Sequence, residues 1–184
     1  MKLNKLTQTI LTAALAAIPF TAFAANGSTP DAAQTAEKVR KELVTLPFYG
    51  VFDNLWFEVN DGMVTLHGVV TRPTLKTSAE RVAQRVAGVT SVVNRIEVLP
   101  LSNFDDGIRL RVLRAVYGQP ALQRYQLGAQ PSIRILVKNG EVTLEGIVLN
   151  DMERNIANIQ ANAVFGVFKV NNNLRVEKPA APKA

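Results

Sequence analysis

Apolar positions recur along this chain at two different spacings, and each spacing predicts one kind of element. Between residues 31 and 47, apolar side chains return every three or four positions, which is typical of an amphipathic helix with one buried stripe. Asp31 or Thr35 is suited to cap the start of this helix, and Pro47 is expected to end it. Its buried positions are predicted to be Val39, Leu43 and Leu46.

A strict alternation of apolar and polar residues follows, and it predicts two strands joined by a tight turn. The turn falls at Asn60-Asp61-Gly62, because glycine adopts the positive φ that a hairpin requires. Trp56 and His67 are expected to point away from the buried face of the sheet. The inward positions are predicted to be Leu55, Phe57, Val59, Val64, Leu66 and Val70.

Helical spacing then returns and is followed by one more alternating segment. The second helix is expected to lie on the sheet, since its small residues permit close approach, and to end at Gly88. Its inward positions are predicted to be Ala79, Val82, Ala83 and Val86. The inward positions of the last strand are predicted to be Val92, Asn94, Ile96 and Val98.

The whole pattern occurs twice in the chain. Residues 61–70 match residues 139–148 at an offset of 78, and the same offset continues without a gap through the last strand. Upstream of the first strand the offset is 73, so the second copy carries five extra residues, within 118–132. The insertion has two equally acceptable explanations. It could form a specialised contact of the second copy, or it could be neutral drift in the length of a loop.

We therefore predict two modules of one fold, at residues 31–99 and 105–177. Residues 100–104 are the expected linker, and residues 178–184 the expected disordered tail. The predicted fold class is α+β, with the order α-β-β-α-β in each module. Each module is expected to form a three-stranded mixed sheet with two helices packed on one face and the other face open.

Residues 1–24 have the three-part plan of a secretory signal peptide. Lys2 and Lys5 precede an apolar stretch, and Ala22-Phe23-Ala24 supplies small residues for cleavage after Ala24 or one residue later. The apolar stretch is much shorter than the ~20 residues that a membrane-spanning helix needs. We expect cleavage and export to the periplasm.

Composition restricts the chemistry that the chain can perform. The 184 residues contain no cysteine and a single histidine, which excludes disulfides, thiolate metal sites and thiol catalysis. A Ser/His/Asp triad or a histidine-rich metal site would depend on His67 alone, and we interpret this histidine as solvated. No pair of acid and base carboxylates recurs in both copies. We expect no catalytic residue, no metal, no cofactor and no small-molecule substrate.

The formal net charge of +6 favours an anionic partner. The basic residues do not form the dense stripe that binds a nucleic acid backbone. The expected export would also separate the protein from nucleic acids, so we do not expect nucleic acid binding. An anionic phospholipid surface or a protein of the cell envelope is the expected partner.

The repeated motif Gly-x-Val-x-Leu-x-Gly-x-Val, followed after a helix by Gly-Val-x-x-Val-x-Asn, resembles the BON domain. Its structural positions are Gly62, Gly68, Gly88 and Asn94 in the first copy, and Gly140, Gly146, Gly166 and Asn172 in the second. We interpret the glycines as turn and close-packing positions, and the asparagines as hydrogen-bonding groups that close the helix-to-strand loop. The resemblance implies a non-enzymatic periplasmic protein that associates with phospholipid membranes or envelope partners under osmotic or envelope stress.

Two regions are candidates for the contact with a membrane or partner. The first is aromatic and comprises Trp56, Phe48 and Tyr49. The alternative is that Phe48, Val51 and Phe52 fold back to close the core or the contact between the modules. The second comprises Arg109, Arg111 and Arg114, on a helix predicted over residues 108–117. A solvated helix face is the alternative interpretation of these arginines.

Two functions remain open on these grounds. A membrane-associating envelope protein would bind anionic lipid in a salt-sensitive way. A soluble, chaperone-like module would instead hold peptides or proteins on Trp56 and the open face of the sheet, and its affinity would survive salt.

Overall fold

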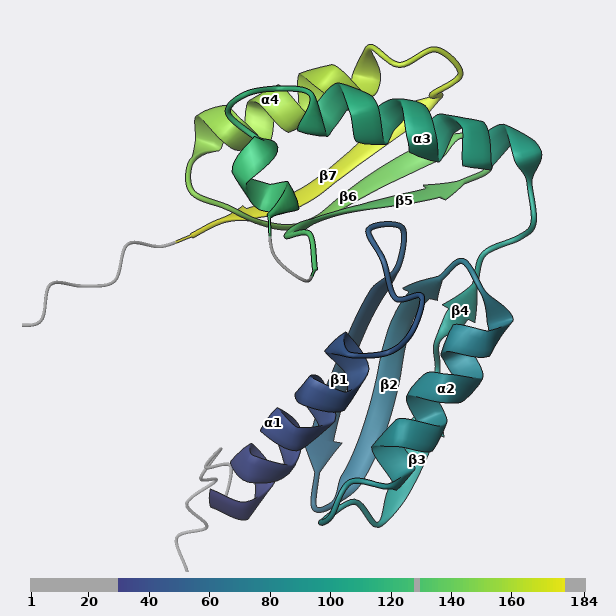
Figure 1. Cartoon of the computed structure of the whole chain (residues 1–184), viewed down its shortest axis with the longest axis vertical. Helices are drawn as coiled ribbons and strands as arrows, with labels where there is room; N and C mark the ends of the chain where they lie inside the picture. Colours follow the sequence, from purple (N-terminus) through teal and green to yellow (C-terminus); the bar gives the residue numbers. More distant parts are fainter. Residues whose placement is uncertain (1–29, 128–129, 178–184) are drawn as a thin grey trace, which may run out of the picture.

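The computed structural model describes residues 30–127 and 130–177 and places them in two modules of the same plan (Figure 1). The expected signal peptide at residues 1–24 and the expected tail at residues 178–184 lie outside the described residues. None of the helices in the described part is long and apolar enough to cross a membrane.

The first module packs two helices on one sheet. Its elements are α1 (Pro30–Val44), β1 (Asn54–Asn60), β2 (Met63–Val70), α2 (Pro73–Gln84), β3 (Ser91–Asn94) and β4 (Glu97–Val98). The strand β1 pairs antiparallel with β2, and β2 pairs parallel with both β3 and β4. The predicted last strand is thus interrupted at residues 95–96.

The second module repeats this arrangement. Its elements are α3 (Asn103–Tyr117), a short 3-10 helix (Gln123–Gln126), β5 (Ile133–Lys138), β6 (Glu141–Val148), α4 (Asp151–Asn162) and β7 (Lys169–Val176). The strand β6 lies in the middle, antiparallel to β5 and parallel to β7. The α+β class and the mixed sheets are as predicted.

Two helix starts differ from the prediction. The helix α1 begins at Pro30, so Thr35 lies buried within it and does not cap it. The helix α3 begins five residues before the predicted start, because the Ser102 Oγ accepts a hydrogen bond from the Asp105 backbone N–H at 3.2 Å. Asn103 and Phe104, expected in the linker, therefore belong to the first turn of α3.

Each module has its own apolar core between its helices and its sheet. The alternation predicted for the strands is observed: Val64, Leu66 and Val70 are fully buried, whereas Trp56 is exposed. The small residues predicted in the second helix are buried in both copies, at Ala79 and Ala157 among others.

Asn94 and Asn172 tie the last strand of each module to the helix packed on it. The Asn94 Nδ2 donates to the Lys76 carbonyl at 3.0 Å, and the Asn172 Nδ2 donates to the equivalent Arg154 carbonyl at the same distance. Each Oδ1 also accepts a backbone N–H two residues later. These amides serve structure, as predicted, but they bind the first turn of the helix rather than its C-terminal end, which precedes the loop.

The second glycine of each motif brings two strands into close contact. Gly68 and Gly146 have φ values of 119° and 139°, a region that other residues rarely adopt. A Cβ at Gly68 would overlap the carbonyl oxygen of Asn54, and a Cβ at Gly146 would overlap that of Ser132. The glycine is required twice, for the same steric reason.

The modules are joined by a loop of the first module as well as by the linker. Residues 48–53 lie between α1 and β1 and reach the β5 edge of the second sheet (Figure 1). There the Ile135 N–H donates to the Val51 carbonyl at 2.9 Å, and the Arg134 guanidinium donates to the Gly50 carbonyl at 2.8 Å. Val51 and Phe52 pack against the core of the second module. We call residues 48–53 the bridging loop.

Candidate functional site

The three arginines predicted to form one basic surface have different surroundings. Arg109 is only 4% exposed. Its guanidinium pairs with Asp106 and donates to the Val137 carbonyl at 2.7 Å, so it fastens α3 to β5. A buried side chain of this kind has no access to a lipid surface. The prediction that Arg109 contacts a membrane or partner is therefore wrong. Helical spacing alone did not reveal this burial, because arginine is most often an exposed residue.

Arg111 and Arg114 remain available on α3. Arg114 is exposed, and Arg111 is half-buried with one guanidinium nitrogen close to Gly166. Neither takes part in an ion pair with any residue of the described ranges. Their charges are thus uncompensated locally.

The predicted aromatic region also separates into parts with different roles. Tyr49 packs in the first module, where its hydroxyl accepts the Leu55 N–H at 3.3 Å and the Arg134 guanidinium lies 4.7 Å from its ring centre. Phe48 is 72% exposed, with the guanidinium of Arg72 4.8 Å from its ring. The rest of the bridging loop closes the contact between modules, which is the alternative expected from the sequence.

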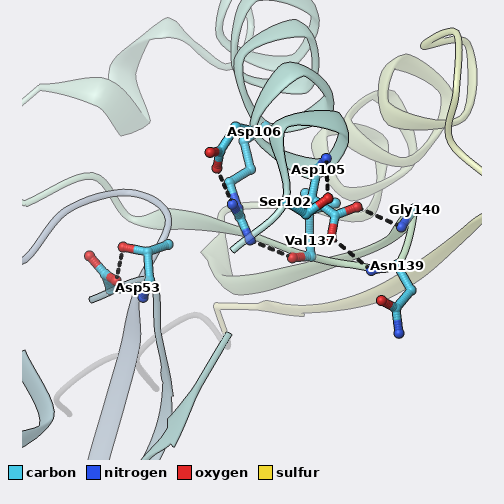
Figure 2. Close-up of polar contacts among 9 residues, drawn as sticks. Asp53, Ser102, Asp105, Asp106, Val137, Asn139 and Gly140 are labelled. Carbon is cyan, nitrogen blue, oxygen red and sulfur yellow. Dashed lines mark hydrogen bonds and ion pairs between the residues drawn. The ribbon is translucent and has the colours of Figure 1, made fainter. Parts of the chain in front are cut away.

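The carboxylate of Asp53 fixes the end of the bridging loop (Figure 2). It is buried, and it accepts hydrogen bonds from the backbone N–H of Gly50 at 3.0 Å and of Thr71 at 2.7 Å. The Thr71 hydroxyl donates to it as well, at 2.9 Å. The loop conformation is therefore tied to the end of β2.

Trp56 stacks on His67 across the β1–β2 pair. Their ring centres are 4.0 Å apart and their planes differ by 7°. His67 is thus half-buried under the indole and is not the freely solvated histidine expected from the sequence. Its Nε2 has no hydrogen-bond partner in the described structure.

The five-residue insertion supplies partners for a buried carboxylate. Glu153 occupies the position of the core residue Leu75 in the first module, and it is buried. The Tyr125 hydroxyl donates to Glu153, and the Arg124 guanidinium lies 3.2 Å from it. Burial, and then the hydrogen bond to Glu153, raise the pKa of Tyr125. The insertion therefore has a packing role within the second module.

Three exposed phenylalanines gather at one end of the second module, and the sequence analysis did not single them out. Phe104 is 50% exposed at the start of α3, while Phe165 and Phe168 are 86% and 77% exposed in the loop between α4 and β7. The ring centres of Phe104 and Phe168 are 6.3 Å apart. Gly166, which follows Phe165 in the chain, lies close to both Phe104 and Arg111. We call Phe104, Phe165 and Phe168 the aromatic tip.

Buried polar groups beneath the aromatic tip hold the ends of its elements together. Asp105 is buried, and its carboxylate accepts the N–H groups of Asn139 and Gly140 at 2.9 and 2.8 Å (Figure 2). The start of α3 is thereby fixed to the turn between β5 and β6. Gly140 in turn adjoins the ring of Phe168, so the aromatic tip stands on an ordered base.

The aromatic tip has no counterpart in the first module. At the offset of 78, Phe165 and Phe168 correspond to Ala87 and Thr90, and at the offset of 73, Phe104 corresponds to Asp31. The two copies share their glycines, asparagines and buried positions, so three aromatic differences in one place distinguish the second. A comparison of exposed positions between the copies would have found these residues in the sequence.

The described residues hold no group of three or more histidine, aspartate or glutamate side chains placed to bind a metal ion. The polar clusters around Asp53, Asp105 and Glu153 are instead satisfied by backbone N–H groups and nearby side chains.

The BON domain family model matches the chain twice, over residues 31–100 and 105–178. The chain belongs to the BON domain family. BON domains are known for association with membranes or phospholipids, and the family is generally non-enzymatic.

A search of curated proteins finds no match to this BON protein. Among solved structures, two similar chains are both CdsD, a structural protein of the type III secretion system of Chlamydia trachomatis. The first, its C-terminal domain, is 12% identical with a TM-score of 0.27, and the match covers 77% of this chain and 96% of that one. The second is 14% identical with the same TM-score, and covers 75% and 90%. Neither similarity supports a conclusion about partners.

Both BON domains retain the glycines and the asparagine that shape the backbone, and the second adds the aromatic tip. The features common to the copies therefore explain the fold. The features in which they differ are the ones to examine for function.

Proposed function

We propose that this BON protein is a non-enzymatic envelope protein that associates with anionic phospholipid membranes through the aromatic tip of its second domain. The observation that carries the proposal is the exposure of Phe104, Phe165 and Phe168 at one end of the second domain, where the rings of Phe104 and Phe168 are neighbours on a fixed base. Large apolar side chains exposed together mark contact surfaces, and aromatic rings on loops suit the interface of a bilayer.

Two cationic side chains adjoin the aromatic tip, and a third lies further along α3. Arg111 adjoins Gly166 at the base of the aromatic tip, Lys169 follows Phe168 directly, and Arg114 lies one helical turn further along α3. Each basic residue close to an anionic membrane contributes about 1 kcal/mol. Apolar insertion and charge attraction would therefore act at the same end of the molecule.

The periplasm is the proposed location, and support of the envelope under osmotic stress the proposed context. The predicted signal peptide at residues 1–24 supports export, and the stress context that the resemblance to the BON domain implies supports the stress role. The location and the stress role are independent of the membrane contact, and the experiments below test the membrane contact alone.

Co-sedimentation with vesicles tests the proposal. The chain from Ala25 onward is mixed with vesicles with and without about 20% anionic lipid, at low and high salt. We expect binding that needs the anionic lipid and weakens with salt. Binding that is absent in all four conditions would overturn the proposal.

Paired variants locate the contact. F165S/F168S is expected to abolish sedimentation, whereas F48S, which removes a similarly exposed ring from the bridging loop, is expected to leave it unchanged. R111Q/R114Q is expected to weaken binding, and R81Q/R85Q, the same charge change at the C-terminal end of α2, is the control. If the Phe48 variant loses binding and the tip variant keeps it, the contact lies on the first domain instead.

A further inference from the structure

A cavity lies at the junction of the two domains. Its volume is about 340 Å³, which is at the lower end of the range for small-molecule sites. The first domain, the linker and α3 all contribute to its lining, which includes Phe52, Arg72, Leu101, Asp106, Arg109 and Leu110. A molecule bound in this cavity would therefore touch both domains at once.

The first domain contributes the N-terminal end of α2 to this cavity, and that end is positive. Arg72 is the residue that precedes the helix, and its side chain makes no capping hydrogen bond. The first turn of α2 holds no acidic residue, and Arg72 forms no ion pair with any residue of 30–127 or 130–177. The positive end of the helix dipole and the guanidinium charge therefore act at the same place.

The second domain closes the equivalent helix end with its own side chains. At the offset of 78, Arg72 corresponds to Asn150, whose Oδ1 accepts the Glu153 N–H at 2.9 Å. Asp151 and Glu153 lie in the first turn of α4. The second copy thus has a cap and two acids where the first has a cation, so the start of α2 is suited to an external anion.

Arg109, which also lines the cavity, gives a second and independent indication of an anion. Its side chain is 5% exposed, and two of its guanidinium nitrogens bind the Asp106 carboxylate and the Val137 carbonyl. The third nitrogen, Nε, is buried and has no hydrogen-bond partner among the described residues. A buried N–H donor without an acceptor is costly, so an acceptor bound in the cavity would remove this cost.

We propose that this cavity binds a small organic carboxylate with a short apolar chain. Two arginines and one aspartate give the lining one net positive charge, which a single carboxylate balances and a doubly charged phosphate group exceeds. The apolar chain would cover exposed hydrophobic surface, since Leu101 and Leu110 are 95% and 47% exposed. The bound molecule would hold the two domains together through its contacts with Arg72, Arg109 and Leu101.

Nuclear magnetic resonance with octanoate as the probe tests the proposal. Octanoate is titrated into the chain from Ala25, and the Nε–H resonances of the arginines are recorded together with the backbone amides. We expect a saturable shift of the Arg109 Nε–H and of the amides at the start of α2. Octanol, which lacks the charge, and inorganic phosphate, which lacks the chain, are each expected to bind at least tenfold more weakly. The proposal is overturned if millimolar octanoate gives no saturable shift, or if octanol or phosphate binds as tightly.

A substitution at Arg72 tests the charged part of the site. R72N installs the capping residue of the second copy, so it is expected to keep the fold while it weakens octanoate binding at least tenfold, because one charge-assisted hydrogen bond is lost. R81N, the same substitution at another exposed position of α2, is expected to leave binding unchanged. Octanoate binding by R72N equal to that of the unmodified chain would overturn the proposal.

Two further variants separate this cavity from other apolar surfaces. L101S is expected to weaken octanoate binding, whereas L127S, which removes another highly exposed leucine, is expected to leave it unchanged. F165S/F168S is also expected to bind octanoate normally, because the aromatic tip does not line the cavity. If F165S/F168S loses octanoate binding and L101S keeps it, the carboxylate binds at the aromatic tip and the proposal is wrong.

Discussion

Arg109 and Arg114 lie on one helix, but Arg109 makes buried structural contacts and Arg114 does not. Arg109 donates to the buried carbonyl of Val137, whereas Arg114 is exposed and pairs with no acid in the described part of the chain. Removal of Arg109 leaves a buried acceptor without a donor, which costs about 1–3 kcal/mol.

We therefore expect Arg109→Met to lower the free energy of unfolding by about that amount, and Arg114→Gln to change it by about 0.5 kcal/mol or less. Urea denaturation followed by circular dichroism measures both. Equal stabilities of the two variants would show that the Arg109 contacts contribute nothing.

Tyr117 makes stability depend on alkaline pH. Its hydroxyl donates to the Ile133 carbonyl at 2.6 Å, and burial raises its pKa to about 12. In the unfolded chain this tyrosine ionises near pH 10, so the unfolded state releases a proton that the native state retains. Stability should be unaffected below pH 10 and should fall by about 2–3 kcal/mol as the pH rises to 12.

Tyr117→Phe is the matched variant for this pH effect. It is expected to be less stable by about 1 kcal/mol at neutral pH, because the hydrogen bond to Ile133 is lost. Its stability should decline less between pH 10 and 12 than that of the unmodified chain. Parallel stability curves over this range would exclude a contribution from Tyr117.

At the scale of elements, the bridging loop belongs to the sequence of the first domain, but two of its partly buried side chains, Val51 and Phe52, pack against the core of the second. Val51 and Phe52 are placed against the buried residues of the second domain by the hydrogen bond between Ile135 and Val51. Truncation of a large core side chain costs several kcal/mol when it leaves a cavity.

Phe52→Ser is therefore expected to destabilise the second domain, although the substitution lies outside it. Residue-level hydrogen exchange measures this effect, and protection should decrease in β5 and β6 more than in β1 and β2. Phe48→Ser, on the same loop but exposed, is the control. A loss of protection confined to the first domain would contradict the assignment of Phe52 to the second core.

The elements themselves could be predicted from the sequence, because helical and alternating periods record which side chains are buried. Asn94 and Asn172 were also interpreted correctly, since an amide at an inward position needs a partner. The start of α3 differs from the prediction because its N-cap, Ser102, lies in the expected linker. The aromatic tip was missed because its residues come from two separate segments, which only the fold brings together.

At the scale of the whole molecule, the aromatic tip belongs to the second BON domain alone. It is built by α3 and the loop before β7. Substitutions in the aromatic tip should therefore leave the core of the first domain intact, because no side chain of that core lies in it.

The bridging loop also gives the chain a direction in which to fold. Translation delivers the first domain before the second, so Val51 and Phe52 are already synthesised when β5 emerges. The later domain then completes its core on a surface that the earlier one presents. Synthesis from the N-terminus thus supplies a template for the second domain, namely the surface formed by Val51 and Phe52. In a circularly permuted chain that begins at the second domain, this domain would complete its core only after the first domain had been synthesised.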